Sequence, residues 1–440
     1  MRKNLYIILV GVTGILLVCI FLFSKKAPEK NIPSFKDRKG TIALSGEWLN
    51  SKKAMEGLLA AIEANPNDYK SMLSLSQAYI QEGRETGDHG YYDKAALELL
   101  DKIITEQPNN FDAMCCKATV LLSQHHFAEG LELAQKTLPL NPNSAFIYGI
   151  LCDANLELGN YDNAVKMCDK MISVRPDIRS YSRVSYLREI YGDTPGAIGA
   201  IKMAVAAGYP GLEQTEWTRC ILAHLYENVG SLDSAEVQYK IALQERPNYA
   251  FAIAGLGRIE KAKGNYKEAI AYYEKAKGLI TEYSFSDELT DLYRLNGETE
   301  KANETAKEVI NMLGPNANVE GESGHGHYAD KELAYAYLKI NDVDNALKHA
   351  LVEYERRPQN IDVAETLAWV EYKKGEFAEA NKHITTALKT NSQNPTLMCR
   401  AGLIKIKAGE TEKGKAFIKK ALSADPFIET ELKKEITPYL

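Results

Sequence analysis

The sequence repeats itself with a period of 34 residues, and this spacing constrains the possible folds more than any other feature. Pro108, Pro142, Pro176 and Pro210 follow one another at this interval. A small residue stands twelve positions before the proline, as Ala164 does before Pro176. Apolar residues between these points follow a helical spacing, which predicts two amphipathic helices in each unit. One such pair cannot bury its apolar face alone, so the pattern predicts a stack of neighbouring pairs.

Close packing explains the constant spacing in sequence between the small residue and the proline. The second helix of a pair must cross the first closely, and a large side chain at the crossing would cost about 1–3 kcal/mol through overpacking. Proline then ends the second helix, because it lacks the N–H that continues the hydrogen-bond ladder. The crossing residues predicted in this way are Ala54, Ala96, Gly130, Ala164, Ala197, Ala235, Ala269, Ala302, Ala346, Ala380 and Gly414.

These features resemble the tetratricopeptide repeat, a family of helix pairs with this period, over about residues 47–430. Gly-Asn-Tyr or a close variant opens several second helices, as in GNYDNA, GNYKEA and GEFAEA. The resemblance implies an all-α fold, a right-handed superhelical solenoid whose first helices line a concave groove. We expect about ten repeats over residues 67–426, with one capping helix before them at 47–66 and another after them at 427–440.

The N-terminal region differs from the repeats. After a short tail at residues 1–4, residues 5–23 form a run of nineteen residues without a charge. At about 1.5 Å per residue, a helix of this length spans roughly 28 Å, close to the hydrocarbon thickness of a bilayer. We therefore predict one N-terminal transmembrane helix, followed by a flexible linker at residues 24–46. A cleavable signal peptide is the alternative, but no A-x-A-like cleavage site follows the run.

Basic residues flank this apolar run on both sides, so charge alone does not decide its orientation. Arg2 and Lys3 precede it, and Lys25, Lys26 and Lys30 follow it. A short N-terminal tail before one long hydrophilic domain favours an extracytoplasmic, periplasmic position for the repeats. The alternative is a repeat domain on the cytoplasmic face of the membrane.

The charge and the cysteine content argue against several functions. The chain has 53 basic and 59 acidic residues, a net charge of −6, so we do not expect the concentrated basic surface of a nucleic-acid-binding protein. Its seven cysteines form no CxxC pair, and we expect them to be buried apolar residues. No catalytic set of side chains is recognisable, so the sequence predicts a protein that is not an enzyme and has no cofactor.

One loop leaves a metal site open as the alternative. Glu322, His325, His327 and Asp330 lie within residues 321–330, and a His-x-His pair beside carboxylates is able to bind a metal ion. No HExxH helix accompanies them, and glycine-rich loops often carry solvated histidines. A metal-binding protein or an enzyme would use this loop.

The family resemblance implies that partner-binding residues lie on the first helices, at the positions that face the groove. These positions hold aromatic and basic residues, which are the types that dominate protein interfaces. Aromatic residues at helical spacing also pack between repeats, so each candidate could belong to the core instead. The candidate partner-binding residues are Arg179, Arg183, Tyr186, Trp217, His224, Phe251, Arg258, Tyr335 and Trp369.

Together these predictions indicate a membrane-anchored scaffold. The repeats would bind a segment of a partner protein in the concave groove, by surface complementarity rather than by reaction chemistry. Envelope biogenesis and the assembly of protein complexes are the settings that similar membrane-anchored bacterial repeat proteins imply. Self-association through the groove or a cap is a third possibility.

Overall fold

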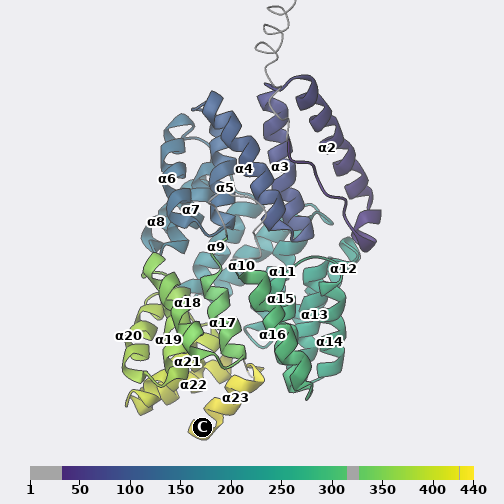
Figure 1. Cartoon of the computed structure of the whole chain (residues 1–440). Helices are drawn as coiled ribbons and strands as arrows, with labels where there is room; N and C mark the ends of the chain where they lie inside the picture. Colours follow the sequence, from purple (N-terminus) through teal and green to yellow (C-terminus); the bar gives the residue numbers. More distant parts are fainter. Residues whose placement is uncertain (1–31, 315–326, 426) are drawn as a thin grey trace, which may run out of the picture.

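The computed structural model describes residues 32–314, 327–425 and 427–440. Within these ranges the chain forms 22 α-helices and no β-strand. Figure 1 shows the helices following one another in a wound stack, with the α2–α3 region and the C-terminus at opposite ends of the molecule. The prediction of an all-α solenoid is therefore confirmed.

Among the described residues one α-helix, α2 (Gly46–Ala64), precedes ten helix pairs, and the two helices of each pair pack against each other. The first helices are α3 (Tyr69–Thr86), α5 (Phe111–Ser123), α7 (Ala145–Glu157), α9 (Ile178–Ile190), α11 (Glu213–Glu227), α13 (Ala250–Lys263), α15 (Tyr283–Leu295), α17 (Asp330–Lys339), α19 (Ile361–Lys374) and α21 (Pro395–Lys407). The second helices are α4 (His89–Glu106), α6 (Phe127–Thr137), α8 (Tyr161–Val174), α10 (Thr194–Ala206), α12 (Leu232–Glu245), α14 (Tyr266–Lys277), α16 (Thr299–Leu313), α18 (Val343–Arg356), α20 (Phe377–Ala387) and α22 (Thr411–Ala424). The last α-helix, α23 (Thr430–Ile436), packs against α21, and short 3-10 helices are η1 (Gly40–Leu44), η2 (Leu138–Leu140) and η4 (Thr437–Tyr439).

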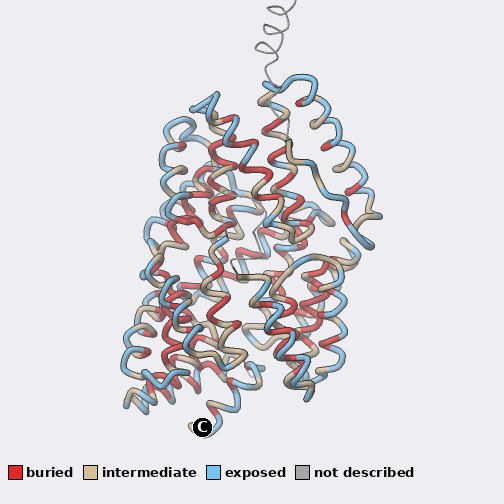
Figure 2. The backbone as a smooth tube through the Cα atoms, viewed as in Figure 1, coloured by how far each residue is buried: buried red, intermediate tan, exposed pale blue. Residues whose placement is uncertain are grey.

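The small residues at the crossings of the helix pairs are buried, and Figure 2 shows buried positions along the faces that helices turn toward their neighbours. Ala164 and Ala235 have no exposed surface. A Cβ atom added at Gly130 would lie only 2.7 Å from a methyl carbon of Leu122, so the Leu122 side chain would have to shift to admit even an alanine at this crossing. Ala54 corrects the prediction, because it lies on the unpaired helix α2 and is exposed.

Successive turns of the solenoid touch each other, so residues far apart in sequence form hydrogen bonds. The backbone N–H of Thr281 donates to the carbonyl of Thr86 at 2.9 Å. The backbone N–H of Ile361 donates to the hydroxyl of Tyr161 at 2.8 Å. Repeats that are far apart in sequence are therefore held against each other across successive turns.

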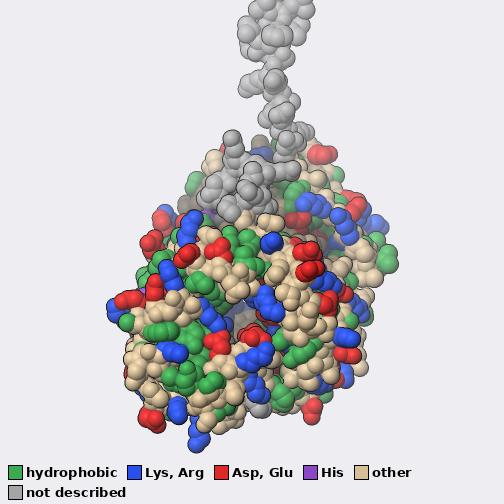
Figure 3. Space-filling model, turned by 60° about the horizontal axis from the view of Figure 1, so that its bottom comes forward, with side chains coloured by type: hydrophobic (Ala, Val, Ile, Leu, Met, Phe, Trp, Pro, Cys, Tyr) green, Lys and Arg blue, Asp and Glu red, His purple; other side chains and the backbone are tan. Residues whose placement is uncertain are grey.

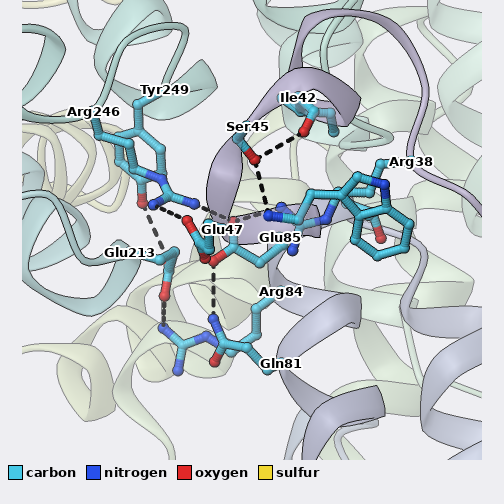
Figure 4. Close-up of polar contacts among 12 residues, drawn as sticks. Arg38, Ile42, Ser45, Glu47, Gln81, Arg84, Glu85, Glu213, Arg246 and Tyr249 are labelled. Carbon is cyan, nitrogen blue, oxygen red and sulfur yellow. Dashed lines mark hydrogen bonds and ion pairs between the residues drawn. The ribbon is translucent and has the colours of Figure 1, made fainter. Parts of the chain in front are cut away.

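The described part of the predicted flexible linker, residues 32–45, instead packs against the first repeat. The guanidinium of Arg38 is buried and donates two hydrogen bonds to Glu82 on α3, at 2.9 and 2.7 Å. The Tyr79 hydroxyl donates to the carbonyl of Pro33. The linker prediction is therefore wrong for residues 32–45, since a buried arginine is fixed by its carboxylate partner. Figure 4 shows Arg38 beside the residues that join this segment to the middle of the chain.

The predicted transmembrane helix at residues 5–23 lies outside the described residues. In the part of the chain that the structure does describe, no helix is both long enough and apolar enough to cross a membrane. The anchor therefore stays a prediction.

Candidate partner-binding groove

The central groove lies between the first helices α11, α13 and α15 on one side and residues 425 and 427–433 on the other. It consists of two adjoining cavities of about 320 and 360 Å³ that share His224, Arg258 and Glu288. Figure 3 shows the C-terminal end of the molecule, with a depression near the middle of the face and charged side chains of both signs around it. We call the smaller cavity the aromatic pocket.

Three aromatic rings form the wall of the aromatic pocket. Trp217, Phe251 and Phe285 lie 34 residues apart, so they occupy the same position of three successive repeats. The rings of Trp217 and Phe251 meet edge to face with centres 4.8 Å apart, and those of Phe251 and Phe285 meet in the same way at 5.6 Å. Ring quadrupoles favour this T-shaped geometry. Trp217 is 38% exposed, so its ring offers apolar surface to a ligand.

Four of the predicted partner-binding residues meet at this pocket, namely Trp217, His224, Phe251 and Arg258. Arg258 is held from two sides, because it donates hydrogen bonds to Glu227 at 3.0 Å and to the Tyr239 hydroxyl at 2.6 Å. Burial alone would raise the pKa of Glu227, but the charge of Arg258 and the hydrogen bond from His224 lower it to about 2. The positive charge of Arg258 is therefore balanced by an ionised carboxylate within the protein.

A second ion pair lies in the groove beside the first. The ammonium of Lys261 on α13 donates to Glu288 on α15 at 2.8 Å. Burial would raise the pKa of Glu288, but the charges of Lys261 and then Lys339 lower it to about 2. The groove thus presents paired charges around apolar rings.

Three predicted residues lie on α9, outside the two cavities. Arg183 donates two hydrogen bonds to Asp153 on α7, at 2.8 and 2.5 Å, and is half-buried. Part of the Tyr186 side chain is exposed. The surrounding protein nevertheless desolvates its hydroxyl, which raises the pKa of Tyr186 well above the usual value. Arg179 is exposed, and its guanidinium lies 5.8 Å from the centre of the Phe146 ring. These residues form a separate surface of the solenoid.

The two remaining predicted residues belong to the C-terminal core. Trp369 is only 7% exposed and stacks on Tyr372 with ring centres 5.0 Å apart. The guanidinium of Arg400 covers the Trp369 ring at 5.0 Å and donates a hydrogen bond of 2.9 Å to the hydroxyl of Tyr335, which is half-buried. This corrects the prediction for Trp369, because residues of α23 pack in the same cluster and cover that side of α19.

Sequence reasoning missed several residues of the groove. Phe285 was missed although it follows Phe251 by one repeat period, so a strict 34-residue register would have found it. Tyr273 comes from a second helix, which the family pattern does not assign to the groove. Phe427 and Glu429 reach the groove from the C-terminal end of the chain, and no local pattern indicates this long-range contact.

The metal-binding alternative falls partly outside the described residues, which leave out Glu322 and His325. The carboxylate of Asp330 already accepts hydrogen bonds within the protein, from His349 at 2.6 Å and from Arg356. The ring of His327 lies 4.3 Å from that of His125. Among the described residues no group of three or more histidine, cysteine, aspartate or glutamate side chains is arranged to hold a metal ion.

Comparison with known families agrees with this fold. A family model for the tetratricopeptide repeat matches residues 252–282, which cover α13–α14 except for the first two residues of α13, and residues 395–427, which contain α21–α22. The chain contains tetratricopeptide repeats. Protein O-mannosyl-transferase TMTC1 from Homo sapiens is 24% identical over 243 residues, which make up 53% of this chain and 26% of that protein. The chain therefore spans about a quarter of the length of that relative.

Solved structures with related folds are more distant. The Thermus thermophilus protein TTC0263, described as a tetratricopeptide repeat protein, has a TM-score of 0.37 at 22% identity, over 42% of this chain and 94% of that chain. The human IFIT1 dimer with m7Gppp-AAAA has a TM-score of 0.47 at 16% identity, over 84% and 86%. Yeast Tom70 has a TM-score of 0.35 at 15% identity, over 89% and 93%. All three TM-scores are below 0.5.

Proposed function

We propose that this chain is a membrane-anchored scaffold, not an enzyme, and that it binds an extended segment of a partner protein in the central groove. The aromatic pocket carries this proposal. A row of rings from three repeats stands at the wall of a cavity, and its outermost ring, Trp217, is 38% exposed. Exposed tryptophan beside a preformed cavity is a common centre of binding energy in protein interfaces.

The charges of the groove indicate what kind of partner it binds. Arg258 is neutralised by Glu227, and Lys261 by Glu288, so neither cation depends on a partner's carboxylate. A partner segment is therefore held chiefly by burial of apolar and aromatic side chains, which is worth about 25 cal/mol per Å². The paired cations and the net charge of −6 also argue against a nucleic-acid ligand.

The membrane attachment rests on the sequence of residues 5–23. An uncleaved helix there would hold the repeats beside the membrane, with residues 47–440 on the extracytoplasmic, periplasmic side. In that position the scaffold would serve envelope biogenesis or the assembly of a protein complex. A cytoplasmic orientation is the alternative.

The binding surface is tested with the full-length protein purified from detergent-solubilised membranes together with any protein that it retains. Trp217→Ala should weaken binding of the retained partner by about 2 kcal/mol or more. Tyr209→Ala is the matched control, because Tyr209 is an aromatic residue that is 77% exposed and does not line the groove. Equal binding by both variants would show that the partner does not use the groove.

The topology is tested separately in sealed cells from which the outer membrane has been removed. Protease added outside should digest the repeat domain if it is extracytoplasmic. Full protection would assign the domain to the cytoplasmic face, and a mature N-terminus near residue 25 would rule out the uncleaved anchor.

A further inference from the structure

The hydroxyl of Tyr273 is buried at the aromatic pocket and makes no hydrogen bond to any described residue. The side chain is only 1% exposed. Its ring crosses α13 at Gly257, where a Cβ atom would lie 2.8 Å from the ring carbons. A buried hydroxyl without a partner costs about 1–3 kcal/mol, so such a group needs a reason.

The preceding repeat shows how the same position is satisfied. Tyr239 stands 34 residues before Tyr273, and its ring likewise crosses α13 at a glycine, Gly255. The Tyr239 hydroxyl donates to Glu227 and accepts from Arg258, in both cases at 2.6 Å. The donor and one acceptor site of that hydroxyl are thus used inside the protein.

One repeat later, both of these partners have been replaced. The positions 34 residues after Glu227 and Arg258 hold Lys261 and Leu292. Leu292 is fully buried and cannot form a hydrogen bond, and the ammonium of Lys261 is directed to Glu288 at 2.8 Å. No described side chain therefore pairs with the hydroxyl of Tyr273, although the residue lines the pocket.

The rest of the pocket favours a neutral ring as the group that meets this hydroxyl. Trp217 is the exposed ring of the row and Phe251 is partly buried behind it, and such rings pack best against another aromatic ring. The nearby ions already form pairs, so an additional charge would be buried without a counterion at a large cost. The incoming ring needs a polar atom at its tip, because the hydroxyl lies at the buried end of the Tyr273 side chain.

We propose that the aromatic pocket selects a tyrosine side chain of the partner segment, whose ring packs against Trp217 and Phe251 and whose hydroxyl forms a hydrogen bond with Tyr273. This inference rests on the proposed function, since it names the side chain that the groove receives. Phenylalanine at the same place would leave the Tyr273 hydroxyl buried and unpaired. The selectivity expected from one neutral hydrogen bond is about threefold to tenfold.

The experiment uses the full-length protein labelled with fluorotryptophan and followed by fluorine NMR. The chain has three tryptophans, so the Trp217 signal is assigned from Trp217→Phe. N-acetyl-tyrosinamide and N-acetyl-phenylalaninamide are the probes. Both should shift the Trp217 signal, and the tyrosine amide should reach half-saturation at a concentration about threefold to tenfold lower.

Tyr273→Phe should make the two amides bind equally, without loss of phenylalaninamide binding. Tyr239→Phe is the matched control and should keep the preference, because its hydroxyl is used by Glu227 and Arg258. Equal binding of the two amides by the wild-type protein would overturn the proposal without any variant, and so would a preference that survives in Tyr273→Phe. Loss of the partner in Trp217→Ala together with either of these results would leave the groove as the binding surface and reject only the tyrosine selectivity.

Discussion

The guanidinium of Arg246 donates a hydrogen bond of 2.7 Å to Glu47, although 199 residues separate the two in sequence. The same guanidinium donates to Glu85 on α3 at 2.5 Å and to the carbonyl of Gly211 at 3.0 Å (Figure 4). One side chain therefore joins the first helix of the described chain, the first repeat and the middle of the solenoid. This contact closes the first turn of the solenoid onto the repeats that carry the central groove.

Breaking this contact should loosen the N-terminal segment before the rest of the solenoid. Arg246→Met removes the nearest cation from the buried Glu85 and leaves it only the more distant Arg38 at 3.9 Å, so this region should be destabilised by up to about 3 kcal/mol. Hydrogen exchange should become faster in α2 and between α12 and α13, with little change in α19–α22, because repeats interact mainly with their neighbours. Lys240→Met removes an exposed ion pair with Glu236 and is the control. An equal effect of both variants would contradict the role of Arg246.

The same network predicts a pH dependence at the N-terminal segment. Burial raises the pKa of Glu85 from about 4.5 to about 7, so the folded protein binds this proton more tightly than the unfolded chain. Stability at this contact should therefore decrease as the pH rises from 4.5 to 7. Glu85→Gln keeps the shape of the protonated acid and should flatten this local dependence. Exchange rates of α2 and α3, corrected for intrinsic chemistry, provide the measurement, and an unchanged slope in the variant would contradict the prediction.

The fold was predictable because the sequence pattern that specifies each helix pair is local and recurs along the chain. Ala164 and Ala235 mark helix crossings at a constant distance from a proline or its position, and both are fully buried. The same logic failed for Ala54, since among the described residues no first helix precedes α2 for this residue to pack against. The linker also escaped sequence reasoning, because nothing near Arg38 in the sequence shows that its carboxylate partner is Glu82 on α3.

The groove was predictable only in part, because its far wall depends on how the turns of the solenoid close. Trp217 and Phe251 follow from the repeat position alone. Trp369 also lies at a first-helix position that the family pattern assigns to the groove. The C-terminal residues pack over its side chain, however, and bury it. Tyr273 stands out only when its hydroxyl is compared with that of Tyr239, which requires the hydrogen bonds and not just the residue types.

Overpacking a helix crossing should damage one repeat first. Ala235 has no exposed surface, so Ala235→Leu should destabilise the α11–α12 pair by about 1–3 kcal/mol. Ala54→Leu is the matched control: the same substitution at an exposed site should change stability by no more than about 0.5 kcal/mol. Urea unfolding gives the total effect and hydrogen exchange gives its location. Loosening spread evenly over all repeats would contradict the assignment of Ala235 to a crossing.

The stability of a second contact between turns of the solenoid should depend on pH in the opposite direction. The Nδ1 atom of His125 lies 2.7 Å from the carbonyl oxygen of Tyr328, and this contact joins the turn between α5 and α6 to the residues before α17. Burial and the adjacent imidazole of His327 lower the pKa of His125 from 6.5 to about 4, although the carboxylate of Glu332 opposes this. The folded protein thus binds this proton less tightly than the unfolded chain, so stability at the contact should fall as the pH falls from 6.5 to 4.

Substitution of His125 by asparagine should remove this sensitivity to acid. The backbone at His125 is left-handed, with φ of 63°, and asparagine tolerates that conformation better than most residues while keeping an N–H donor. Hydrogen exchange of residues 122–127 and 327–333 should rise on acidification in the wild-type protein and stay flat in His125→Asn, after correction for intrinsic rates. His224→Asn is the control, because His224 is exposed and does not take part in contacts between these turns. If His125→Asn loosens as much as the wild-type protein on acidification, then protonation of His125 is not what opens the contact, and the neighbouring His327 becomes the group to test.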